Sequence, residues 1–251
     1  MKNSKKILLL ILIALIIVFY GSFITLDWST FYFKTYNPAT PTTLFSRILK
    51  LIVSFLSALI AIIIDNDGFD KIETKRLKHI FVIIFLADLC FFINVSVPGI
   101  CLFALAQFLL IIRNGQGLIR FFTKGHAKLK KKEVITEGII IFVFLILLFK
   151  LVFFPLLHGN NMLYLGFIYS ILLCLSLWVA WSSPLVALIP HKNSVLIAIG
   201  MTFFFFCDLT VGINIFSEPG LIKSLAAFST WIFYTPAITL LSLSGYSIKV
   251  A

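Results

Sequence analysis

Two aspartates lie inside apolar stretches of the sequence, where an ionisable side chain is unusual. Asp88 lies in the segment Ile80–Val95, and Asp208 lies in Ser194–Asn214. Two carboxylates that face one cavity of low dielectric cannot both ionise easily, so the pair can share a proton and offer one acid and one base. Such a pair suits hydrolysis, in which one group donates a proton and the other activates water, and it also suits proton-coupled transport. The simpler interpretation is that each aspartate only hydrogen-bonds one helix to another.

The two aspartates belong to a repeated motif. Both copies read F-x-x-D-L-x-x-x-I-N; the first contains Asp88 and Asn94, and the second, 120 positions later, contains Asp208 and Asn214. A Pro-Gly pair follows each copy. Matching Phe, Leu and Ile residues are common in a chain of this composition, whereas matching Asp and Asn residues inside apolar segments are not. The sequence therefore predicts two related halves, about residues 1–125 and 126–251, within a single domain.

The composition requires the apolar segments to be membrane spans. Of the 251 residues, 61% are hydrophobic and 12% are charged, whereas soluble chains have about 45–50% apolar and about 25% charged residues. These values exclude a soluble domain and a disordered chain. We expect an all-α integral membrane protein of eight transmembrane helices, four in each half, which makes the halves parallel repeats about an axis along the membrane normal. The eight predicted segments are Ile7–Phe23, Leu44–Ile64, Ile80–Val95, Gly99–Ile112, Val134–Phe154, Met162–Trp181, Ser194–Asn214 and Leu221–Leu243.

The basic residues support this count of helices. If the N-terminus is cytoplasmic, 16 of the 21 Lys and Arg residues fall on the cytoplasmic side, loop by loop, as the positive-inside rule requires. Both termini are then cytoplasmic, in an inner or plasma membrane, and the net charge of +11 reflects topology rather than binding of nucleic acid. The stretch Lys128–Lys132 either binds anionic lipid headgroups or only sets the topology. Most other acidic residues, such as Glu73, are expected in loops.

A further group of polar residues lies in or near the predicted spans, and each has two interpretations. The first is a contact with a substrate. The second is structural: Asn94 and Asn214 would end their helices before the Pro-Gly turns, and Lys50 would extend to the outer surface. Three more residues, Gln107, Tyr169 and Tyr234, would form hydrogen bonds between helices in the structural interpretation.

Other catalytic chemistries lack their motifs. The four histidines have no spacing typical of metal ligands, and the four cysteines form no C-x-x-C pair, so neither a metal site nor a disulfide framework is expected. No G-x-S-x-G, P-loop or dinucleotide-binding glycine pattern occurs. We therefore expect no cofactor.

The sequence around both aspartates resembles the YhhN-like family of membrane proteins, which includes lysoplasmalogenases. The run ending in Ala87-Asp88-Leu resembles the family's G-D motif, with Ala in place of Gly. The run from Gly200 to Asp208, continuing to Phe216, resembles the family's G-x-x-x-F-x-x-S-D…I-x-x-F segment, with Cys207 in place of Ser. Positions that also correspond are Lys50-Leu51, where the family tends to have Lys-Pro, and Tyr169. The chain departs from the family at Gln107, where the family usually has His, and at Ala237, where it has Gln.

This resemblance implies an eight-helix membrane hydrolase that cleaves the vinyl ether bond of a lysoplasmalogen, a lysophospholipid. The products would be a fatty aldehyde and a glycerophospho-head group. Asp88 and Asp208 match the family's two essential aspartates, and Lys50 would hold the phosphate. The departures at Gln107 and Ala237 bear on the choice of substrate. The alternatives to this activity are a proton-coupled transporter and a non-catalytic lipid-binding protein.

Overall fold

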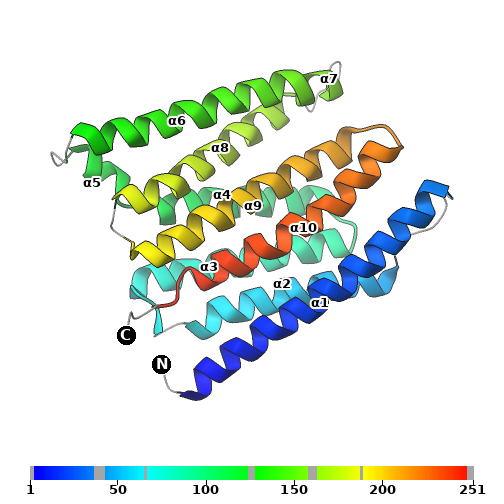
Figure 1. The fold of residues 1–251 in the computed structure, drawn as a ribbon, viewed down its shortest axis with the longest axis horizontal. Helices are drawn as coiled ribbons and strands as arrows, with labels where there is room; N and C mark the ends of the chain where they lie inside the picture. Colours follow the sequence, from blue (N-terminus) through cyan, green and yellow to red (C-terminus); the bar gives the residue numbers. More distant parts are fainter. Residues whose placement is uncertain are drawn as a thin grey trace.

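The computed structural model describes residues 3–36, 43–64, 67–123, 128–157, 163–186 and 189–247. All regular elements in these ranges are helical (Figure 1). They are α1 (Asn3–Tyr36), α2 (Leu44–Ile64), α3 (Lys71–Phe92), α4 (Ser96–Asn114), α5 (Leu118–Thr123), α6 (Lys128–Leu148), the π-helical turn η2 (Phe149–Phe153), α7 (Phe154–Leu157), α8 (Leu163–Val186), α9 (His191–Phe216) and α10 (Leu221–Leu243). Helices α2 and α10 have the bounds that the sequence predicts, whereas α1 continues well beyond the expected end at Phe23.

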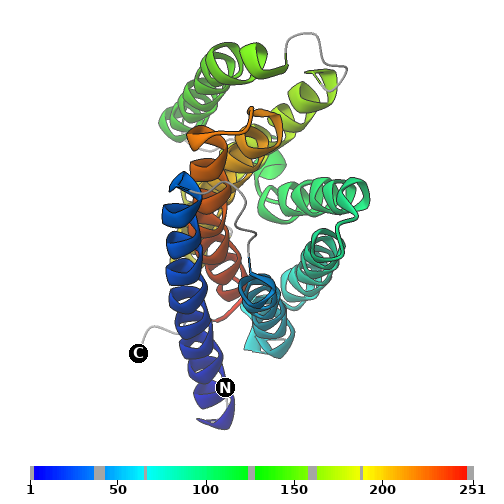
Figure 2. The same ribbon diagram turned by 90° about the vertical axis from the view of Figure 1, so that its right-hand side faces the viewer.

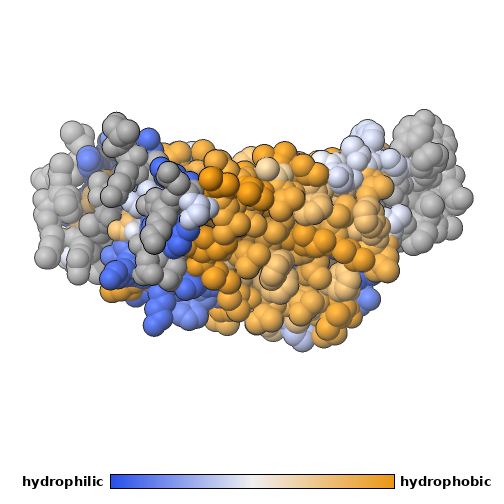
Figure 3. Space-filling model, turned by 90° about the horizontal axis from the view of Figure 1, so that it is seen from below, coloured by the Kyte–Doolittle hydropathy of each residue, from blue (hydrophilic) through white to orange (hydrophobic). Residues whose placement is uncertain are grey.

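Seven of the described helices are long and apolar enough to cross a membrane: α1, α2, α4, α6, α8, α9 and α10. Figure 3 shows the corresponding surface, an apolar band that separates hydrophilic residues at the ends of the molecule. Helix α3 has 22 residues but carries charged side chains in its first two turns, among them Lys71, Lys75 and Arg76. The structure therefore supports a membrane protein with several spanning helices.

The ends of α3 have clear local causes. Asp70 caps the N-terminus, because its carboxylate accepts the backbone N–H groups of Ile72 and Glu73 at 2.8 and 2.9 Å. Asn94 follows the C-terminus with φ of 63°, a left-handed conformation that Asn tolerates and that ends helices. The predicted helix-ending role of Asn94 is confirmed. The same role for Asn214 is wrong, since α9 continues past it to Phe216.

The long helices have the same order of neighbours in both halves of the chain. In the first half, α1 packs on α2, α2 on α3 and α3 on α4; in the second, α6 packs on α8, α8 on α9 and α9 on α10. The two halves meet mainly through α4 against α8 and through α10 against both α1 and α2 (Figures 1 and 2). The last long helix of each half thus contacts the second long helix of the other, and α10 contacts α1 as well.

The connection between α2 and α3 lies beside both ends of the described chain. Lys5 pairs with Asp67 at 3.0 Å, and Ser247 donates its backbone N–H to the Asp67 carbonyl oxygen at 3.1 Å. The hydrogen bond from Lys5 holds the pKa of the Asp67 carboxyl below its ordinary value. The start of α1 and the end of α10 therefore lie at one end of the bundle, which we call the basic end after Lys5 and the lysines at the starts of α3 and α6 (Figure 1).

Candidate functional site

The carboxylate of Asp88 lies in the core, where two hydroxyl groups from other helices reach it. Asp88 is on α3, and its Oδ2 atom accepts hydrogen bonds from the Ser54 hydroxyl on α2 and the Tyr234 phenol on α10. All three side chains are buried. The helix packing described above explains this contact, because α2 touches both α3 and α10.

The carboxylate of Asp208 has a similar but distinct set of partners. Its Oδ2 atom accepts the Tyr169 phenol on α8 at 2.8 Å and the Gln107 side-chain amide on α4 at 3.2 Å. The Ser176 hydroxyl on α8 donates to the other end of the Gln107 amide at 2.9 Å, which fixes its orientation. Gln107 is fully buried. The structure thus brings Gln107 and Tyr169 together with Asp208, and Tyr234 together with Asp88.

Each aspartate therefore joins the two halves of the chain. Asp88 accepts one hydrogen bond from its own half and one from α10 of the other half. Asp208 does the same with α8 and with α4. The two sets of contacts are close to each other, because Phe103, one turn before Gln107 on α4, has its ring 6.0 Å from the Tyr234 ring.

The partners of the two carboxylates differ in the protonation states that they allow. A hydroxyl group can either donate or accept, so Ser54 and Tyr234 can serve Asp88 whether its carboxyl group is neutral or ionised. The nitrogen of the Gln107 amide can only donate, so it favours an ionised Asp208. The arrangement can therefore hold one neutral and one charged carboxyl group in a shared core, which is the division that acid–base catalysis needs.

Lys50 forms a buried ion pair that the sequence analysis did not identify. Its ammonium lies 2.6 Å from Asp27 on α1, and Asp27 also accepts the Ser46 hydroxyl at 2.6 Å. The Trp231 ring lies 5.0 Å from the same ammonium. Only 7% of Lys50 is exposed, so its side chain does not extend to the surface. The one sequence signal for this pair is that the apolar run of α1 continues past Asp27, through Trp28 and Phe31.

The ion pair and Asp88 lie along one face of α2. Lys50 and Ser54 are four residues apart, so they point to the same side of the helix. On α10, Trp231 and Tyr234 are three residues apart, and their rings meet edge to face with centroids 5.2 Å apart. Side-chain contacts consequently continue from Asp27 through Lys50, Trp231 and Tyr234 to Asp88.

A second buried ion pair lies at the basic end. Arg113 on α4 is fully buried, with its Nε atom 3.6 Å from a carboxylate oxygen of Glu73. It also donates to the Ser244 hydroxyl at 3.0 Å, directly after α10. Glu73 was expected in a loop, but it lies in the first turn of α3. This pair joins α3, α4 and the C-terminal end of α10.

The remaining predicted site residues lie apart from the carboxylates or outside the contacts above. Asn94 is exposed after α3, and its side chain accepts a hydrogen bond from Arg47 at 3.0 Å. Asn214 is half-buried near the end of α9. Within the described ranges, no three His, Cys, Asp or Glu side chains gather as metal ligands would, and all four cysteines are free.

Comparisons with protein-family models, curated proteins and solved structures give no match for this chain. The side chains and their geometry are therefore the basis for inferring a function. The central feature is the pair of carboxylates, Asp88 buried and Asp208 half-buried, each held between the two halves by donors that include candidates named from the sequence.

Proposed function

We propose that the protein is a membrane-embedded hydrolase that cleaves the vinyl ether bond of a lysoplasmalogen. The observation that carries the proposal is the pair of carboxylates with unlike partners: Asp88 is buried between two hydroxyl groups, and Asp208 is half-buried against a phenol and an amide donor. An ionisable residue inside the membrane is expensive and is usually kept for function. Two such residues at matching positions of a repeat support a shared chemical role more than a purely structural one.

The proposed roles follow from the hydrogen bonds. Neutral Asp88 is the acid: it adds a proton to the vinyl carbon farther from the ether oxygen, which leaves an oxocarbenium ion. Ionised Asp208 stabilises this cation and takes a proton from the water that attacks it. The hemiacetal that forms collapses as its hydroxyl proton passes to the ether oxygen, which gives a fatty aldehyde and the free hydroxyl group of the glycerophospho-head group. Transfer of one proton from Asp208 to Asp88 then restores the starting states. Net, one water is consumed, and neither step requires a metal or cofactor.

The proposed topology has eight spans, with α3 as the eighth. Its charged turns lie at the basic end, and its apolar part, with Asp88, lies in the core beside α2 and α4. The shared order of neighbours in the two halves supports a parallel repeat of four helices each, about an axis along the membrane normal. The basic end would face the cytoplasm, with both termini.

The test is release of aldehyde from a lysoplasmalogen by the purified protein in detergent. We expect release by the wild type and a loss of about 100- to 10,000-fold in Asp88→Asn and in Asp208→Asn. Glu133→Gln is the matched control, because Glu133 is an exposed carboxylate on α6. Unfolding temperatures of all variants separate a loss of chemistry from a loss of fold. Turnover that survives in both Asn variants would rule the proposal out.

A proton-coupled transporter is the second candidate, and one observation favours it. Each carboxylate accepts hydrogen bonds from both halves, and transporters built from repeats bind protons and substrates at such an interface. The two functions differ in what they require: hydrolysis proceeds in detergent, whereas transport needs sealed vesicles and a gradient. Proton-driven uptake into vesicles by a protein that releases no aldehyde would favour the transporter.

A further inference from the structure

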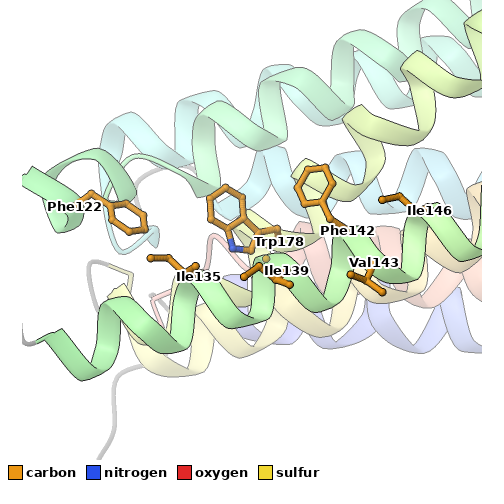
Figure 4. Close-up of a pocket in the computed structure, with 8 residues that line it drawn as sticks. Phe122, Ile135, Ile139, Phe142, Val143, Ile146 and Trp178 are labelled. Atoms are coloured by element: carbon orange, nitrogen blue, oxygen red, sulfur yellow. The ribbon is translucent and has the colours of Figure 1, made fainter.

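A groove of about 440 Å³ lies along helix α6 (Figure 4), and none of the side chains that bond to Asp88 or Asp208 lines it. Its lining is apolar throughout and comes from α5, α6 and α8: Phe122, Ile135, Gly138, Ile139, Phe142, Val143, Ile146 and Trp178. Ile135, Ile139 and Ile146 are each about half exposed or more, at 48%, 58% and 61%. Because α6 is a candidate span, this groove would open toward the lipid.

The floor of the groove is fixed by a close contact between α6 and α8. Trp178 donates its indole N–H to the Val134 carbonyl oxygen at 2.9 Å. A side chain at Gly138 would lie 2.8 Å from the same indole nitrogen, so the glycine allows the ring to lie against α6. Figure 4 shows the Trp178 ring lying over α6 among the lining residues.

At the basic end of the groove, positive and negative side chains fall on opposite sides of α6. With 3.6 residues per turn, Lys131 and Lys132 fall on the same side of α6 as Ile135 and Ile139. Glu133 and Glu137 fall on the opposite side. Lys131 donates one hydrogen bond to the Phe122 carbonyl oxygen at 2.9 Å, which holds its ammonium beside a lining residue. An ammonium has three donors, so Lys131 retains capacity for an anion.

We propose that this groove binds an anionic phospholipid, with one acyl chain along α6 and the phosphate at Lys131 and Lys132. From Ile135 to Ile146 the helix rises about 16 Å, enough for much of an acyl chain. The lysines at one end of the groove select an anionic lipid over a neutral one, because juxtamembrane lysines attract anionic headgroups. A second copy of the chain would explain the apolar lining but not the two lysines.

Quenching of Trp178 fluorescence by brominated lipids tests this proposal. The protein, with its other three tryptophans replaced by Phe, is placed in phosphatidylcholine bilayers that contain a low, equal fraction of brominated phosphatidylglycerol or brominated phosphatidylcholine. We expect several-fold more quenching by the anionic lipid, with saturation. Lys131→Gln together with Lys132→Gln should remove this excess. The matched control, Lys71→Gln with Lys75→Gln, should keep it, because those exposed lysines lie on α3 at the same end.

A second measurement does not depend on the tryptophan replacements. Native mass spectrometry of otherwise unmodified protein should count phosphatidylglycerol retained through purification, with less retained by the Lys131 and Lys132 double variant and by Ile139→Phe, which narrows the groove. Equal quenching by the two lipids, or an excess that persists without the two lysines, would overturn the proposal. The proposal would also be overturned if neither brominated lipid quenched Trp178 because a second copy of the chain covered the groove.

Discussion

The carboxylates of Asp88 and Asp208 occupy matching places in the helix packing but have different partners. Asp88 is buried and meets two hydroxyl groups, whereas Asp208 is half-buried and meets a phenol and an amide. The repeated motif thus places two identical groups in helices with a similar order of neighbours, and the side chains around them make the two groups unlike. In the function that we propose, this difference is the reason to assign one aspartate as the acid and the other as the base.

Replacing one aspartate or the other should have the most different effects on the pH dependence of turnover. In a bell-shaped profile the alkaline limb reports the acid and the acidic limb reports the base. Any residual activity of Asp208→Asn should lack the acidic limb, and that of Asp88→Asn should lack the alkaline limb. Steady-state rates across pH for both variants check this. Loss of the same limb in both variants would contradict the assigned roles.

The second difference between the two halves is the Lys50–Asp27 ion pair near Asp88. The two copies of the motif are 120 residues apart, and at this spacing Lys50 and Asp27 of the first half correspond to Ser170 and Leu147 of the second. The second half therefore lacks the ion pair. Asp27→Asn leaves a buried ammonium without its counter-charge and should lower the free energy of unfolding by about 3–5 kcal/mol. Unfolding in detergent measures this change. Lys50→Met with Asp27→Leu should recover much of the loss, and a double variant as unstable as the single one would show that the pair is not the cause.

The smallest expected difference concerns the two tyrosines. Hydrogen bonds to charged groups contribute about 1.5–3 kcal/mol, and neutral ones about 0.5–1.5 kcal/mol. Tyr169→Phe should therefore destabilise the protein more than Tyr234→Phe, since Tyr169 donates to the aspartate that we assign as ionised. The two variants serve as controls for each other in unfolding experiments. Equal losses would indicate that the two carboxyl groups have the same charge.

Local pattern predicts much of this fold. The bounds of α2 and α10 match the predicted ones, because apolar runs determine both helices and the Pro-Gly pair before α10 marks its start. The positive φ at Asn94 could likewise be expected from an Asn at the end of an apolar run. Asn214, in the same motif, differs because α9 continues to Phe216.

The sequence named several of the residues around the two carboxylates, but it indicated neither their pairing nor Ser54. The sequence identifies Gln107, Tyr169 and Tyr234 as rare polar residues in apolar segments, yet only the packing shows which aspartate each one reaches. The partner of Arg113 was missed because Glu73 was expected in a loop, and the partner of Lys50 because the first predicted span ends at Phe23, before Asp27. Contacts between residues far apart in sequence depend on the arrangement of helices, which periodicity does not determine.

The most direct test of the central claim is the position of the proton that the enzyme adds. Wild-type protein is incubated with a lysoplasmalogen in D₂O, and the aldehyde is trapped as it forms. The account predicts one deuterium on the carbon next to the carbonyl group, because the exchangeable proton of Asp88 is delivered there. It also predicts no such product from Asp88→Asn. An aldehyde without deuterium at that carbon, or equal labelled product from the variant, would contradict the account.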